Sequence, residues 1–277
     1  ENSKTDIKKF IDTKKTITEE AFTKIKNYKK TVIAEDPLIS ILKKEKNDSN
    51  DMVKKIENMN KKLEQTIVDL KKKINISEVS LENTLNYIKI GMSELEVKQF
   101  LIQQLYQNGA EGISFDPIVL SAANSALPHG HSSENNKLKK GDAILFDFGG
   151  TYQGFNADIT RTFFLEEINE IQKNVYNNVL EANLIGIKNS IIPKTMHEID
   201  DSTTNVLENG GFKEFIVHKT GHGLGLDVHE DPYIVRGNHS SLEEGMIITI
   251  EPGLYLPGKF GIRIEDDVLI TDNSPNV

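Results

Sequence analysis

The segment AILFDFGGTYQGFNADITRTFFL, residues 143–165, contains two apolar stretches joined by a glycine-rich turn. Residues Ala143–Phe148 and Ala157–Leu165 are rich in β-branched and aromatic side chains, which is typical of strands. Gly149-Gly150 and Gln153-Gly154 between them favour a reversal of the chain. We therefore expect the two strands to pair as a β-hairpin.

Each strand of this pair carries one aspartate, Asp147 in the first and Asp158 in the second. A carboxylate in an apolar strand is costly to bury unless it is paired or bound to a cation. If the strands pair, both carboxylates can reach the same face. A surface position or a salt bridge, with Arg161 as the nearest partner, is the alternative, and these residues alone leave both interpretations open.

The segments around this pair predict a mixed α and β domain. Helices are expected from about residue 76 to Gly91, from the capping box Ser93/Glu96 to Asn108-Gly109, at 168–190, and at 195–209 after a second capping box, Thr195/Glu198. A further strand is expected at 113–121, and residues 215–271 have the glycine and β-branched content of antiparallel strands. This order predicts an α+β fold, a curved antiparallel sheet flanked by helices.

Residues 1–75 differ in composition from the rest of the chain. They are rich in Lys, Glu and Asn, and apolar side chains recur at helical spacing between Ile56 and Ile74. An amphipathic helix packed on its own domain and an intermolecular coiled coil are both compatible with this stripe. We therefore expect a helical N-terminal segment at 1–75 and a second domain at 76–277.

The composition of the 277-residue chain excludes several classes of function. A net charge of −9 argues against a nucleic-acid partner, which needs a basic surface. No apolar run is long enough to cross a bilayer, so no membrane partner is expected. The chain has no cysteine, which favours a cytoplasmic protein and leaves carboxylates and imidazoles as the ligands for any metal.

The last third of the chain supplies further metal-ligating residue types. The stretch HKTGHGLGLDVH, residues 218–229, places His218, His222 and His229 among glycines that let a ligand approach the backbone. Glu251 and Glu265 each end an apolar strand. Together with the two aspartates these acids would need compensation, and two divalent cations about 3.5–4 Å apart would supply it.

Six short motifs occur in a fixed order along residues 76–271. They are Leu127-Pro128-His129-Gly130, Phe146-Asp147-Phe148-Gly149, Asp158 ahead of Thr160-Arg161-Thr162, the His218–His229 stretch, Thr249-Ile250-Glu251-Pro252-Gly253 and Arg263-Ile264-Glu265-Asp266. In this combination the chain resembles the pita-bread metallopeptidases. It is most similar to their Xaa-Pro peptidase branch, which comprises prolidase and aminopeptidase P.

The resemblance implies a centre of two divalent metal ions with five ligands. Asp147 would chelate one ion, Asp158 and Glu265 would bridge both, and His222 and Glu251 would complete the shell of the other. A carboxylate-dominated shell favours Mn²⁺, with Co²⁺, Zn²⁺ and Fe²⁺ as alternatives.

The resemblance also implies roles in catalysis for five residues. Glu251 would accept a proton from a water held between the metals, and that water would attack the bond preceding proline. His229 would stabilise the oxyanion, His129 and His218 would line the substrate site, and Arg263 would orient a carboxylate.

The function predicted from these residues is that of an Xaa-Pro dipeptidase acting on small peptides with proline after the first residue. The alternatives are aminopeptidase P acting on longer peptides, methionine aminopeptidase, and a catalytically dead scaffold or binding protein. His218 and Arg263 argue against methionine aminopeptidase, and retention of all five ligands argues against a dead domain.

Residues 1–75 do not resemble the separate N-terminal domain that usually shapes the substrate cleft and mediates dimerisation in this branch. They are interpreted as an incomplete counterpart, and a homodimer is compatible with the resemblance. Among the remaining candidates, His131, His197 and His239 are expected at the surface. For Tyr255, lining the pocket and packing in the core are both compatible with the sequence.

Overall fold

The computed structural model describes residues 76–271 and 275–277, together with the single helical residues Lys54, Asn58 and Lys61. Its contacts divide the chain into two compact units, 1–72 and 73–277. The apolar stripe predicted between Ile56 and Ile74 lies outside the described residues. The roles assigned to the two predicted domains therefore stay predictions. The described strands all belong to the second unit.

Four helices of this unit begin or end close to the predicted positions. They are the helix containing residues 76–87, α4 (Glu94–Gln107), α5 (Glu170–Asn189) and α6 (Met196–Asn209). The two predicted capping boxes are present at the start of α4 and α6, and a third opens α5. The first helix is helical only to residue 87, so its predicted end at Gly91 is wrong. Gly91 instead lies in the following turn, with φ of +90°.

The first sheet contains the strand pair predicted within residues 143–165. β2 (Ile118–Ser121), β3 (Ala143–Phe148) and β6 (Ile159–Phe164) form an antiparallel sheet in the order β2-β3-β6. The pairing of β3 with β6 confirms the predicted hairpin, and it places Asp147 opposite Thr160.

Two details of this region differ from the prediction. β4 (Gly150–Tyr152) and β5 (Phe155–Asn156) are inserted between β3 and β6, and they form a separate small sheet with β1 (Gly112–Ile113) in the order β1-β4-β5. The single strand predicted at 113–121 is in fact β1 and β2. Asp116-Pro117 lies between them, and proline lacks the N–H that a continuous strand would donate.

The second half of the unit is built from antiparallel strands, as predicted. β7 (Gly221–Gly223), β8 (Glu230–Ile234), β9 (Ile247–Ile250) and β12 (Asp266–Leu269) form a sheet in the order β12-β9-β7-β8. β10 (Gly253–Leu256) and β11 (Phe260–Arg263) form a hairpin beside it. An antiparallel bridge between Thr160 and Glu265 joins β6 to the chain between β11 and β12. This bridge joins the first half of the unit, which contains the β2-β3-β6 sheet, to the second half, which contains β7 to β12.

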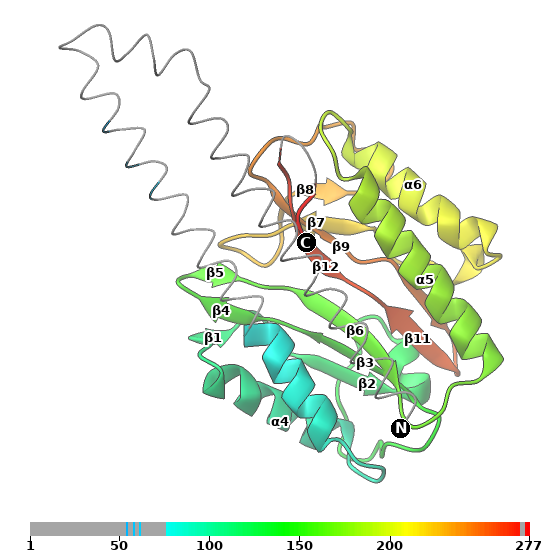
Figure 1. Cartoon of the computed structure of the whole chain (residues 1–277). Coiled ribbons are helices and arrows are strands. Elements are labelled where there is room, and N and C mark those ends of the chain that lie inside the picture. Colours follow the sequence, from blue (N-terminus) through cyan, green and yellow to red (C-terminus); the bar gives the residue numbers. More distant parts are fainter. Residues whose placement is uncertain (1–53, 55–57, 59–60, 62–75, 272–274) are drawn as a thin grey trace, which may run out of the picture. The chain divides into compact units, whose positions relative to one another are not determined.

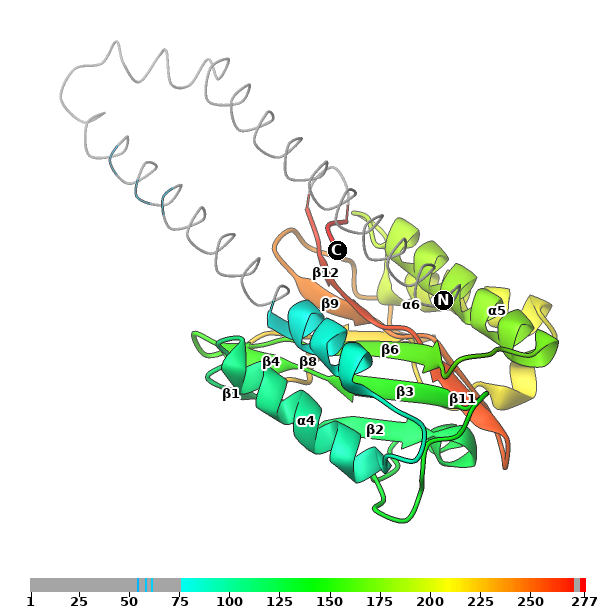
Figure 2. The same ribbon diagram turned by 60° about the horizontal axis from the view of Figure 1, so that its bottom comes forward.

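Helices pack against both halves of the strand assembly (Figures 1 and 2). Val97 and Leu101 of α4 are buried with Phe146 of β3 in one apolar cluster. Val175 of α5 belongs to a second cluster, with Ile262 of β11. The arrangement confirms an α+β fold. Among the described residues, no helix is both long and apolar enough to cross a membrane.

Candidate metal centre

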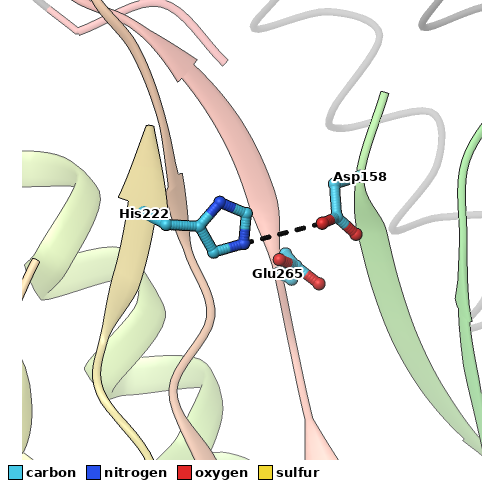
Figure 3. Close-up of side chains that lie close together, drawn as sticks. All are labelled: Asp158, His222 and Glu265. Carbon is cyan, nitrogen blue, oxygen red and sulfur yellow. Dashed lines mark ion pairs between the residues drawn. The ribbon is translucent and has the colours of Figure 1, made fainter. Parts of the chain in front are cut away.

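Three buried side chains from separate segments of the chain converge where the two halves meet (Figure 3). Asp158 lies just before β6, His222 in the middle of β7, and Glu265 between β11 and β12. One ligand atom from each lies within 4.8 Å of the others. His222 Nε2 is 3.7 Å from Asp158 Oδ2. The spacing and residue types suit a shared metal ion.

The other two predicted ligands lie beside this group. Glu251 follows β9, and its Oε1 is 3.5 Å from His222 Nε2. Asp147, in β3, makes an ion pair with Arg263. Burial is the main cause that raises the pKa of Asp158, Glu251 and Glu265, and the charge of Asp147 adds to this rise in all three. The structure therefore brings together all five residues that the sequence singled out as ligands.

His222 is held in the neutral form that binds metals. Its Nδ1 lies 3.0 Å from the Gly223 carbonyl oxygen, to which it donates, so Nε2 presents a lone pair to the carboxylates. Burial lowers the pKa of His222 to about 4. Thr249 Oγ1 accepts a hydrogen bond from the His222 backbone N–H at 3.1 Å and so fixes β7 at this point.

Arg263 connects several groups of the centre. Its Nη2 donates to Asp147, and its Nε donates to Thr160 Oγ1 at 3.0 Å. Thr160 Oγ1 in turn donates to Glu265 Oε2 at 2.6 Å. The guanidinium thus orients one carboxylate directly and a second through a hydroxyl, which fits the role predicted for it.

Tyr255 was not among the predicted site residues, yet its hydroxyl lies between two of them. It accepts from Arg263 Nη1 at 2.6 Å and lies 2.8 Å from His218 Nε2. The side chain is buried, and a buried tyrosine hydroxyl usually has a partner. The sequence left two positions open for Tyr255, lining the pocket or packing in the core. Burial lowers the pKa of His218 to about 4. His218 Nδ1 is 4.0 Å from Glu251 Oε2.

The other two histidines of the predicted site, His129 and His229, are exposed. The His229 ring centroid is 4.4 Å from that of His222. Burial is the main cause that lowers the pKa of His218 and His229, and His129 lies near enough to add to this effect electrostatically. These two histidines thus differ from the proposed ligands, of which Glu251 is half-buried and the other four are buried.

Comparison with known proteins identifies the family. Residues 69–272 match the model of metallopeptidase family M24. The chain belongs to this family.

Proteins similar to this M24 chain include Xaa-Pro dipeptidases and an X-Pro aminopeptidase. An Xaa-Pro dipeptidase of Pyrococcus horikoshii is 42% identical over 183 residues, 66% of this chain and 52% of that protein. The solved structure of an Xaa-Pro dipeptidase from Bacillus anthracis is 41% identical, with a TM-score of 0.73 over 76% of this chain and 59% of that one. An X-Pro aminopeptidase from Thermotoga maritima is also 41% identical, with a TM-score of 0.74 over 76% and 60%.

These similarities confirm the pita-bread fold and the resemblance to the Xaa-Pro peptidase branch. The chain spans about half the length of the curated relatives it matches.

An M24 metallopeptidase uses divalent metal ions, and the buried groups fit them. Burial, followed by repulsion from neighbouring carboxylates, raises the pKa of Asp158 and Glu265 well above the ordinary value. Burial raises that of Glu251 to about 7. Asp147 Oδ1 and Asp158 Oδ1 are buried and have no hydrogen-bond partner. Divalent cations would supply both the missing charge and the missing partners.

The salt-bridge alternative for the aspartates named the wrong arginine. Arg161 pairs with Asp266 at 2.6 Å and donates to the Glu265 carbonyl oxygen, whereas Arg263 is the partner of Asp147. His131 and His239 are exposed, as predicted.

The sequence predicts a surface position for His197, and the structure differs from this. It is half-buried, with its ring centroid 5.0 Å from that of His239, and its Nδ1 accepts a hydrogen bond from the Gly237 N–H.

Proposed function

We propose that the chain hydrolyses the peptide bond preceding proline, with two divalent metal ions held by Asp147, Asp158, His222, Glu251 and Glu265. The observation that carries the proposal is the convergence of three carboxylates, those of Asp158, Glu251 and Glu265, on one neutral, buried imidazole. Family membership supports the reaction class.

The geometry supports a division of the ligands between the two ions. Asp158 and Glu265 approach each other and His222, as residues that bridge two metals must. Asp147 would complete the shell of one ion, whereas His222 and Glu251, 3.5 Å apart, would complete that of the other. We propose Mn²⁺ as the metal because oxygen ligands dominate the set.

Bound divalent ions would supply an activated water and polarise the scissile carbonyl. Glu251 lies between His222 and His218 and is placed to accept a proton there. The exposed His229 and His129 would contact the substrate, and His229 would donate to the developing oxyanion. Arg263 would hold Asp147 and, through Thr160, Glu265.

We favour a dipeptidase, and the name of the Pyrococcus horikoshii relative supports this choice. Aminopeptidase P activity is the second candidate, because the Thermotoga maritima neighbour is an X-Pro aminopeptidase. A cytoplasmic location belongs to the same proposal, since a cysteine-free chain suits a reducing compartment. So does a homodimer, which size-exclusion chromatography with light scattering would test.

Cleavage of three peptide series by the Mn²⁺-loaded protein tests the proposal. We expect kcat/KM for an Xaa-Pro dipeptide to exceed that for Xaa-Pro-Yaa by about tenfold or more, the scale of discrimination that a missing contact gives. Peptides that begin with Met and lack proline should not be cleaved. A tenfold or greater preference for the longer proline peptide would replace the dipeptidase with aminopeptidase P. Absence of proline-specific cleavage would refute the proposal.

A further inference from the structure

The loop of residues 121–136 carries His129 and is closed at its base. It leaves β2 at Ser121, passes through the short helix η1 (Ala122–Ala126), and returns at Asn136. Asn136 Nδ2 donates to the Ser121 carbonyl oxygen at 3.3 Å and lies 3.2 Å from Ser121 Oγ. The two ends of the loop therefore touch, and His129 lies midway between them.

A single carboxylate occupies this base. Glu94, the first residue of α4, is fully buried. Its Oε1 accepts from the Ser121 N–H at 2.6 Å, from Ser121 Oγ at 3.1 Å and from Asn136 Nδ2 at 2.6 Å. Its Oε2 accepts from Asn124 Nδ2 at 2.7 Å and from the Ser133 N–H at 3.0 Å. Glu94 thus binds the loop on both sides of His129.

All five donors are neutral, and no ion pair with Glu94 occurs among the described residues. Charge-assisted hydrogen bonds and the positive end of the α4 dipole stabilise the carboxylate in place of a cation. A charge held in this way depends on every donor keeping its position. Conversely, the loop depends on the carboxylate, because Glu94 accepts a hydrogen bond from each of these donors and its loss would remove all five bonds.

We call Glu94 and its five hydrogen-bond donors the clamp. Two further features link this clamp to the position of His129. Ala122, directly after the clamped Ser121, has φ of +49°, a left-handed conformation that alanine disfavours. The loop would therefore tend to relax if the clamp were lost. On the other side of the loop, Pro128, the residue before His129, accepts a hydrogen bond from Arg263 Nη1 at 3.4 Å. The backbone at His129 thus lies between the clamp and the metal centre.

We propose that Glu94 is a positioning residue, which holds the 121–136 loop so that His129 faces the substrate side of the metal centre. The effect on peptide cleavage rests on the proposed function, whereas the clamp on the loop does not. The two are therefore tested by separate measurements.

Glu94→Gln is the test variant, and Glu96→Gln is its matched control on the same turn of α4. In either orientation, the amide NH₂ introduced by the first substitution would face two or more donors of the loop. Glu96 instead accepts from the Ser93 N–H at 2.6 Å and pairs with the exposed Lys137, and glutamine keeps an acceptor for that cap.

Hydrogen–deuterium exchange tests the clamp without reference to activity. We expect residues 121–136 to exchange about tenfold faster in Glu94→Gln, because local opening no longer breaks the five hydrogen bonds. The control should match the wild type. Unchanged protection of the loop in Glu94→Gln would overturn the proposal. If that variant does not fold, Asn124→Leu, which removes one donor at similar volume, should loosen the same loop.

Kinetics on an Xaa-Pro dipeptide then test the link to His129. Glu94→Gln should lower kcat/KM by about 10- to 100-fold at unchanged metal content, because the ligands lie on other segments. Combined with His129→Ala it should add no further loss, as residues acting through one another are not additive. Equal kcat/KM in Glu94→Gln and Glu96→Gln, or full additivity with His129→Ala, would refute the positioning role. An inactive wild type with a loosened Glu94→Gln loop would instead refute only the proposed function.

Discussion

At the scale of single residues, the two neighbouring histidines at the centre should respond differently to substitution. His222 is buried with Nε2 towards the carboxylates, so His222→Ala should lower metal occupancy and abolish cleavage. His229 is exposed, so His229→Ala should keep the metal and lower kcat by about 10²–10³, as the loss of an oxyanion donor does. Metal analysis and kinetics on both variants check this. Full metal occupancy in His222→Ala would contradict its assignment as a ligand.

The five proposed ligands could be predicted because each stands out locally. Asp147 and Glu251 interrupt or end apolar strands, and that placement is visible in the sequence. The partners of these residues could not be predicted in the same way. Arg263 contacts Asp147, 116 positions earlier, and Tyr255 contacts His218, 37 positions earlier. Such contacts depend on how distant segments pack, which no local pattern contains.

At the scale of elements, the sequence predicted most helices and strands but not how the strands are interrupted. Capping boxes mark α4 and α6 because their hydrogen bonds are local. The division of 113–121 into β1 and β2 follows from pairing with two different sheets. The bridge between Thr160 and Glu265, which completes the site, joins residues 105 positions apart and has no local signature.

Close contact between β7 and β9 makes Gly221 a sensitive position. A Cβ there would lie 1.9 Å from the Thr249 carbonyl oxygen, so Gly221→Ala must push β7 away and displace His222. We expect it to lower the free energy of unfolding by about 2 kcal/mol or more and to reduce metal occupancy.

Gly154→Ala, in a turn with φ of +78° and nothing within 4 Å of its Cβ, is the control. It should cost only about 1 kcal/mol and leave metal occupancy unchanged. Urea unfolding and metal analysis distinguish the two. Equal metal occupancy in both variants would show that β7 is not held as the structure has it.

At the scale of the whole molecule, the metal centre places like charges between the two halves of the fold. An acid whose pKa is raised on folding holds its proton more tightly in the folded state, so stability falls as the pH rises. The pKa of Glu251 is raised to about 7, and those of Asp158 and Glu265 lie well above the ordinary value. His218 and His222, with pKa lowered to about 4, act in the opposite direction, mainly below pH 6.5.

The metal-free protein should therefore lose stability between pH 6.5 and 8, on the order of 1 kcal/mol per pH unit. Urea unfolding in the presence of a chelator measures this slope. Saturating Mn²⁺ should remove it, because bound cations compensate the carboxylates. Asp158→Asn should make the slope of the metal-free protein shallower. A stability that rises over this range without metal would show that the carboxylates are not coupled as described.

Metal content and Xaa-Pro cleavage, measured together on the wild type and on Asp158→Ala, test the central claim most directly. Asp158 is the proposed bridge closest to His222, and its buried Oδ1 has no other partner. The wild type should bind about two divalent ions per chain, as a two-metal site requires. Asp158→Ala should bind fewer and lose cleavage. Two ions and full activity in Asp158→Ala would contradict the account.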